Sequence, residues 1–355
     1  FRRIDFGTPH GIISGHAILA EGTKNPVFNT ITATVGGFNA GEACTFDTCH
    51  IPISARDHTD LYASGNTISG TSAVGIEVLS CPLHTISITQ NTISNQTYGY
   101  RFQSAISMIE MTDAGISVTK NNIQQSAVNN TLQQGIGIYI ANVALSPITL
   151  LIDSNTIARV KAGIALSNIK AFNGAFVTNN TIQFNKANNF YNAPASGGHG
   201  VHYGIRLNYC KDIRVDTNYV TKTSTTAPDT FMINHLRGVS LENSVRSVVS
   251  DNVFDRMGSG IYVLDICSGS TFTCNTFNTC YHGGNFAGTM PNTAADIGDQ
   301  IINPQNQNIE LTGNIFNNSV SFDLFGRITT NTQWHDSPMP SYYVTGLVPG
   351  SSGSN

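Results

Sequence analysis

The residues best suited to chemistry in this chain gather between positions 199 and 265. They combine carboxylates and guanidinium groups with imidazoles, phenols, an amide and a hydroxyl, a mixture that suits the hydroxyl groups of sugars. The candidates for ligand binding are His199, His202, Tyr203, Arg206, Asn208, His235, Arg237, Ser240, Glu242 and Tyr262. The candidates for catalysis are Glu242, Asp265 and Arg206, because a pair of carboxylates can cleave a glycosidic bond by acid and base catalysis.

An eight-residue pattern determines which elements position these groups. It reads apolar, any, apolar, any, any, Asn, any, apolar, and its clearest copy is Ile86–Ile93. The pattern occurs nine times, with its asparagine at Asn66, Asn91, Asn121, Asn155, Asn180, Asn218, Asn252, Asn275 and Asn314. A second pattern, glycine followed by alternating apolar residues, comes after most copies, for example at Gly75, Gly99, Gly137, Gly204 and Gly238.

Both patterns alternate with a period of two, which predicts short β-strands. Three such strands with their turns fit the shortest interval between asparagines, so each unit is expected to form one turn of a coil. Stacked coils place each asparagine about 4.8 Å above the previous one. There its amide is expected to donate to the next amide, and the asparagine itself is expected to take the left-handed backbone of a sharp bend.

This pattern resembles the right-handed parallel β-helix of the pectin-lyase-like superfamily, with its asparagine ladder between the second and third strands. The resemblance covers roughly residues 61–324 and implies an all-β solenoid of about ten coils. The hexapeptide spacing of a left-handed β-helix is absent. The resemblance also implies that a substrate cleft lies beside the glycine-pattern strand.

The expected coils bring the chemical residues together. Extra residues leave the coil after the asparagine pattern, at 124–136, 183–203, 221–237 and 278–308, and should gather on one side. Counting outward positions from Gly204 and Gly238 places Arg206, Ser240 and Glu242 on neighbouring coils. Glu242 and Asp265 then lie on the order of 6 Å apart, near the range of glycoside hydrolases.

The amino-acid composition limits the classes of protein to which the chain can belong. The chain has 355 residues, 18 Lys+Arg against 22 Asp+Glu and 11% charged residues, whereas about 25% is typical. A net charge of −4 without a basic block argues against nucleic-acid binding. No apolar run approaches the ~18 residues of a membrane span. A polar but weakly charged surface is typical of secreted and cell-surface proteins.

The cysteines and histidines predict no metal site or cofactor. The seven cysteines and ten histidines are scattered, and no spacing matches a zinc site. Cys44 and Cys49 are close enough in sequence for a disulfide, and one pair among Cys267, Cys274 and Cys280 is an open alternative. Cys81 and Cys210 are separated by about five coils and cannot bond to each other.

Three regions are expected. Residues 1–60 are predicted to be irregular first coils or an N-terminal cap that continues an upstream part of a longer protein. Residues 61–324 form the β-helix, and 325–355 form a C-terminal cap with a Pro/Gly/Ser-rich linker or tail.

These features favour a bacterial protein that is secreted or displayed on the cell surface, where it serves as a rigid, adhesin-like or carbohydrate-binding scaffold. Its expected partners are a polysaccharide or surface glycan and other domains of the same polypeptide. One alternative is a polysaccharide lyase or glycoside hydrolase with a groove around the Gly204 and Gly238 coils. A second alternative is a segment similar to a phage tail spike.

Overall fold

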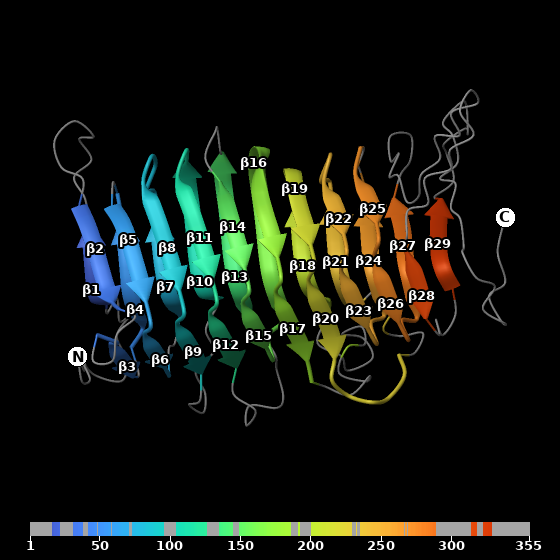
Figure 1. The fold of residues 1–355 in the computed structure, drawn as a ribbon, viewed down its shortest axis with the longest axis horizontal. Helices are drawn as coiled ribbons and strands as arrows, with labels where there is room; N and C mark the ends of the chain where they lie inside the picture. The colour runs from blue at the N-terminus through green and yellow to red at the C-terminus, as the bar shows by residue number, and fades with distance from the viewer. Residues whose placement is uncertain are drawn as a thin grey trace. The chain divides into compact units, whose positions relative to one another are not determined.

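Parallel β-strands make up every regular element of more than one residue in the described part of the protein. The computed structural model describes residues 16–21, 31–37, 42–47, 49–57, 59–70, 73–95, 104–125, 135–144, 149–185, 191, 200–228, 232, 235–265, 267, 269–288, 314–317 and 322–328. The chain divides into two compact units, Phe1–Phe176 and Val177–Asn355, within each of which neighbouring strands lie side by side (Figure 1).

The first unit contains three files of parallel strands, in which each strand pairs with the corresponding strand of the next coil. The first file is β1 (His16–Glu21), β4 (Ile51–Arg56), β7 (Val74–Leu79), β10 (Ser104–Thr112), β13 (Ile136–Ala144) and β16 (Ala162–Thr178). The second file is β2 (Ile31–Gly36), β5 (Thr59–Ser64), β8 (Thr85–Thr89), β11 (Gly115–Thr119) and β14 (Leu150–Asp153). The third is β3 (Thr45–Asp47), β6 (Thr67–Ser69), β9 (Thr92–Asn95), β12 (Asn122–Gln125) and β15 (Thr156–Ala158).

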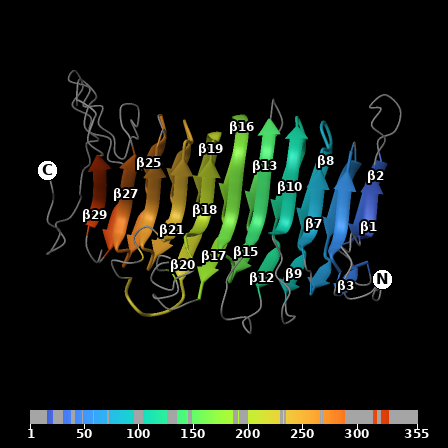
Figure 2. The same ribbon diagram turned by 180° about the vertical axis from the view of Figure 1, so that it is seen from behind.

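The second unit repeats this arrangement (Figure 2). Its first file is β18 (His202–Asn208), β21 (Leu236–Glu242), β24 (Ser259–Leu264), β27 (His282–Gly288) and β29 (Phe322–Ile328). The other files are β19 (Lys211–Asp216), β22 (Val248–Ser250) and β25 (Thr271–Thr273), and then β17 (Thr181–Phe184), β20 (Tyr219–Lys222), β23 (Val253–Asp255), β26 (Thr276–Asn278) and β28 (Ile315–Asn317). The predicted all-β parallel β-helix is therefore confirmed.

The asparagine ladder forms as expected, with more hydrogen bonds than the sequence suggests. Asn91 donates from its side chain and from its backbone N–H to Oδ1 of Asn121, both at 3.0 Å. Asn121 makes the same two bonds to Asn155, at 2.9 and 3.0 Å. In the second unit Asn180, Asn218, Asn252, Asn275 and Asn314 are linked in the same way.

One expectation about the ladder is wrong, because the asparagine does not itself take the left-handed backbone. The residue before it does, with φ of 55° at Gln90, 56° at Lys120 and 56° at Ser154. No ladder asparagine is among the described residues with positive φ. The bend thus belongs to the preceding residue, which leaves each asparagine free to align its amide with the next coil.

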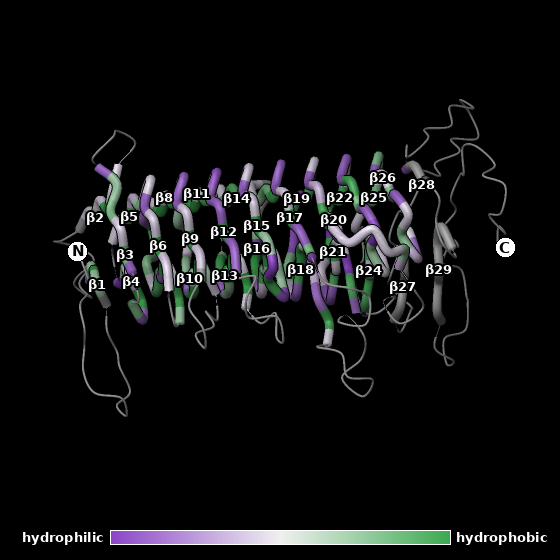
Figure 3. Tube along the Cα trace, turned by 90° about the horizontal axis from the view of Figure 1, so that it is seen from below, coloured by the Kyte–Doolittle hydropathy of each residue, from purple (hydrophilic) through white to green (hydrophobic). Residues whose placement is uncertain are grey.

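Apolar side chains fill the inside of the coils in register. Ile53, Ile76, Ile106, Ile138 and Ile164 occupy one column of the first unit and are all fully buried. Hydrophobic and hydrophilic stretches alternate along the described part of the chain (Figure 3), and buried residues alternate with more exposed ones along β8 and β11. This period of two fixes the strand register, because a slip of one residue would expose the whole column.

The glycine pattern arises from close packing at the start of the first strand. A Cβ at Gly238 would lie 2.4 Å from a ring carbon of Phe254, and one at Gly204 would lie 2.5 Å from Val220. The copy of the glycine pattern at Gly99 lies outside the described residues. The strand that pairs with β7 is β10, which begins at Ser104.

The expected disulfide between Cys44 and Cys49 is not formed, because both thiols are free. The extended strand β3 lies between them. Cys267, Cys274 and Cys280 are free as well. Phe1, Trp334 and the C-terminal tail lie outside the described residues.

Replacing a ladder asparagine tests this architecture. Asn121→Ala removes the acceptor for the backbone and side-chain N–H groups of Asn91, and each buried polar group left unpaired costs about 1–3 kcal/mol. We therefore expect a loss of about 3–5 kcal/mol and a thermal midpoint lower by roughly 4–7 °C.

The matched control for this substitution is Asn122→Ala. The side chain of Asn122 is exposed and accepts only a hydrogen bond from Gln124 among the bonds found for it. Its midpoint should stay within about 2 °C of the parent protein, because surface substitutions have small effects. Equal midpoints for the two variants in differential scanning fluorimetry would contradict the ladder.

Candidate functional site: a buried arginine–glutamate cluster on the outer sheet face

The candidate site lies on the outward face of β18, β21 and β24 in the second unit. The register pairs Tyr203 with Arg237 and Arg206 with Ser240, and on the next strand Ser240 with Tyr262. Asn208 pairs with Glu242 in the same way. The structure thus brings most of the predicted ligand-binding residues onto neighbouring strands.

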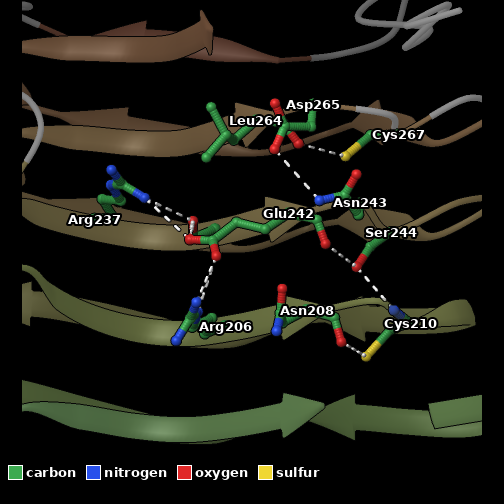
Figure 4. A network of polar contacts seen from close by, with 11 residues as sticks. Arg206, Asn208, Cys210, Arg237, Glu242, Asn243, Ser244, Leu264, Asp265 and Cys267 are labelled. Carbon is green, nitrogen blue, oxygen red and sulfur yellow. Dashed lines mark hydrogen bonds and ion pairs between the residues drawn. The ribbon is translucent and has the colours of Figure 1, made fainter. Parts of the chain in front are cut away.

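Glu242 is the centre of this group (Figure 4). Its Oε2 accepts hydrogen bonds from Arg206, at 2.6 Å from one terminal nitrogen and 3.2 Å from Nε. Its Oε1 accepts from Arg237 at 3.2 Å and from the hydroxyl of Ser240 at 3.3 Å. Two guanidinium groups therefore share one carboxylate, and we call Tyr203, Arg206, Arg237, Ser240, Glu242 and Tyr262 the Arg–Glu cluster.

Two tyrosine rings complete the cluster. The Arg237 guanidinium carbon lies 3.4 Å from the ring centroid of Tyr262 and 5.4 Å from that of Tyr203. The corresponding carbon of Arg206 lies 5.0 Å from the Tyr203 ring. These distances are within the range of cation–π attraction, so the rings hold both guanidinium groups in place.

Most of the cluster is buried although it faces outward from the coil. Arg237 is 7% exposed, Glu242 8% and Ser240 0%. Burial lowers the pKa of Arg237 and raises the pKa of Tyr203. The side chain of Arg206, in contrast, is 36% exposed. Of the three charged groups in the cluster, it is the one most accessible to solvent.

Asp265 does not join Glu242 as a second carboxylate. It follows β24 with a φ of 60°, and its Oδ2 accepts a hydrogen bond from Asn243 at 3.3 Å. Figure 4 shows the Glu242 carboxylate directed toward the two arginines and the Asp265 carboxylate directed toward Asn243. The two acids bind different partners, so the geometry does not assemble the predicted acid–base pair.

The predicted histidines also fall outside the cluster. His202 is fully buried, where its ring lies edge-on to Phe184 and Tyr191, and its Nδ1 is 3.0 Å from the carbonyl oxygen of Gly200. It is therefore part of the core and not of a binding surface. His235 begins the turn into β21, and burial followed by the charge of Arg237 lowers its pKa. His199 lies outside the described residues.

The chain matches the model of one protein family. The family model described as periplasmic copper-binding protein (NosD) matches residues 103–302, more than half of the sequence. The chain belongs to the NosD family. The match includes all of β10 to β27 and the whole Arg–Glu cluster. No curated protein and no solved structure matches the chain.

A related cluster in the first unit of this NosD-family chain was not predicted. The carboxylate of Glu77 accepts hydrogen bonds from Arg56 at 2.8 Å and from Ser54 at 2.9 Å. Ser54, which pairs with Glu77, precedes the first copy of the asparagine pattern, so counting from that pattern could not place it. The Arg, Glu and Ser combination therefore recurs, and the second unit adds another arginine and two tyrosine rings to it.

No helix in the described part of the chain has the length and hydrophobicity to cross a membrane. No three His, Cys, Asp or Glu side chains in the described ranges approach one another closely enough to hold a metal ion.

The acid sensitivity of the fold can be tested at His282, which pairs with Ser259 beside the cluster. Burial lowers the pKa of His282 to about 4, whereas a free histidine has a pKa of about 6.5. Between these values the unfolded chain binds a proton that the folded chain does not, so stability falls as the pH decreases.

We therefore expect the thermal midpoint of His282→Gln to decrease less than that of the parent protein when the pH is lowered from about 7 to 4.5. Comparing the two proteins removes the contribution of the ion pairs, which they share. Parallel midpoint curves for the two proteins would contradict the neutral, buried state of His282.

Proposed function

We propose that this chain is an extracytoplasmic β-helix scaffold that binds an acidic saccharide at the Arg–Glu cluster. The description of the family as periplasmic and the weakly charged, polar composition support a location outside the cytoplasm. The stacked coils provide a rigid surface. Binding in an adhesin-like manner, without turnover, is the role that such a surface serves best.

The observation that carries this proposal is the partial exposure of Arg206 on a buried, rigid support. Its guanidinium lies against Tyr203 and is 36% exposed, whereas Arg237 and Glu242 beneath it are buried. A guanidinium group binds carboxylates through two parallel hydrogen bonds. A partly exposed guanidinium held in this way suits a saccharide that carries a carboxylate.

The hydrogen-bond partners of Glu242 and Asp265 favour binding over the hydrolase alternative. A glycoside hydrolase needs two carboxyl groups on either side of the scissile bond. Both oxygens of Glu242 accept hydrogen bonds from arginine, and Asp265 binds Asn243. No observation on the described residues favours the lyase or the tail-spike alternative.

Copper, which the family description names, is not part of this proposal, because the described donors do not fit it. Copper binds imidazole nitrogen and deprotonated or thioether sulfur. Burial raises the pKa of Cys81 and Cys267 to about 11 and that of Cys280 to about 12, so these thiols stay protonated at neutral pH. Each donates its S–H to a backbone carbonyl, as Cys280 does to Phe254 at 3.5 Å.

Saccharide binding can be measured by isothermal titration calorimetry with oligogalacturonate. We expect Arg206→Ala to weaken binding at least about tenfold, because it removes the charged hydrogen bonds to the ligand. Arg214→Ala is the matched control, since Arg214 is 51% exposed in an ion pair with Asp216 on β19 of the same unit. Equal affinity of the parent and Arg206→Ala, or no binding by the parent, would contradict the proposal.

Copper uptake gives a separate test. Because the buried thiols are protonated and bonded to carbonyls, Cys81→Ala, Cys267→Ala and Cys280→Ala should each retain as much copper after desalting as the parent protein. The measurement is the metal-to-protein ratio by mass spectrometry. Loss of one equivalent of copper in any of these variants would show that its thiol is a ligand.

A further inference from the structure

The two arginines that share Glu242 differ in their access to solvent. The side chain of Arg237 is 8% exposed and that of Glu242 is 10% exposed, whereas that of Arg206 is 36% exposed. Arg237 is also held by Ser240, at 3.2 Å, and by the Tyr262 ring. A ligand can therefore reach Arg206, while the contact between Arg237 and Glu242 lies beneath it.

We propose that Glu242 is a specificity-determining residue, an internal counter-ion with which the carboxylate of a ligand must compete for Arg206. This inference rests on the proposed saccharide binding and adds to it the group that sets the preference for charge. Glu242 Oε2 contacts Nε and one terminal nitrogen of Arg206, which is the edge that a planar carboxylate would use. The ligand and Glu242 therefore seek the same hydrogen bonds.

Arg237 allows Arg206 to exchange Glu242 for the carboxylate of a ligand. Removing one partner of a buried ion pair is strongly unfavourable, because it leaves an uncompensated charge. When Arg206 turns to a ligand, however, Glu242 keeps its contacts with Arg237 and Ser240 through Oε1. In the first unit the carboxylate of Glu77 contacts Arg56. The hydrogen bonds and ion pairs found for Glu77 include no second arginine that could keep it paired if Arg56 moved away.

As a consequence, the effect of Glu242 on affinity should depend on the charge of the ligand. While Glu242 is paired with Arg206, it offsets the positive charge that attracts an anion. A neutral saccharide does not experience this competition, because it forms no ion pair with Arg206. Removing the charge of Glu242 should therefore strengthen binding of an acidic saccharide and leave binding of its neutral counterpart unchanged.

The experiment compares a galacturonate hexamer with its fully methyl-esterified form, which has the same rings without charge. We expect Glu242→Gln to bind the acid form about tenfold more tightly than the parent does, in accordance with the strength of charge-assisted pairs. We expect its affinity for the ester to stay within about twofold. The control is Glu77→Gln, which removes the equivalent carboxylate of the first unit and should leave both affinities unchanged.

Because Glu242→Gln leaves the buried Arg237 without its carboxylate, Glu242→Asp provides a second variant. It keeps the negative charge in the cluster and draws the carboxylate, which contacts both Arg206 and Arg237, back by one methylene group. We expect it to raise the ratio of acid to ester affinity by a few-fold, and circular dichroism verifies that each variant is folded.

The outcomes separate the two proposals. A raised ratio of acid to ester affinity in either folded variant supports the role of Glu242. An unchanged or lowered ratio in both variants, with the parent still binding the saccharides, overturns that role and leaves the binding function intact. Failure of the parent to bind either form overturns both.

Discussion

The hydrogen bond between the side-chain amides of two stacked asparagines is the interaction on which the rest of this structure depends. Each Oδ1, such as that of Asn121, accepts both the side chain and the backbone N–H of the asparagine below it. An acceptor that serves two donors from one residue fixes the height and the rotation of a coil together. Once a coil is fixed in this way, its isoleucine column and its outward side chains have defined neighbours.

The Arg–Glu cluster depends on the fixed register in which neighbouring strands pair. Residues 34 to 36 apart in sequence, such as Arg206 and Glu242, meet at hydrogen-bond distance because their strands pair without a slip. Charged groups on the outside of a sheet are normally solvated and contribute little. Here the tyrosine rings and the neighbouring strand exclude water from Arg237 and Glu242, so these two groups are held in place before any ligand arrives. Preorganisation of this kind lowers the entropic cost of binding.

The sequence was sufficient to predict the ladder and the positions of Arg206, Ser240 and Glu242, because all of them follow from counting along a strict period. The left-handed residue before each asparagine escaped notice because Gln90, Lys120 and Ser154 share no residue type. The ion pairs of Glu242, the hydrogen bond of Asp265 to Asn243 and the burial of His202 depend on side-chain rotamers and packing, which a period does not specify.

Exchange of the ladder amides with solvent is the most direct test of this account. In protein labelled with ¹⁵N at asparagine, the side-chain amide protons of Asn91, Asn121 and Asn218 should remain visible by nuclear magnetic resonance for hours in D₂O, because they are buried and bonded to the next coil. The exposed amide of Asn122 should exchange at once. Rapid loss of the ladder signals together with that of Asn122 would contradict the stacked amides and the registration that depends on them.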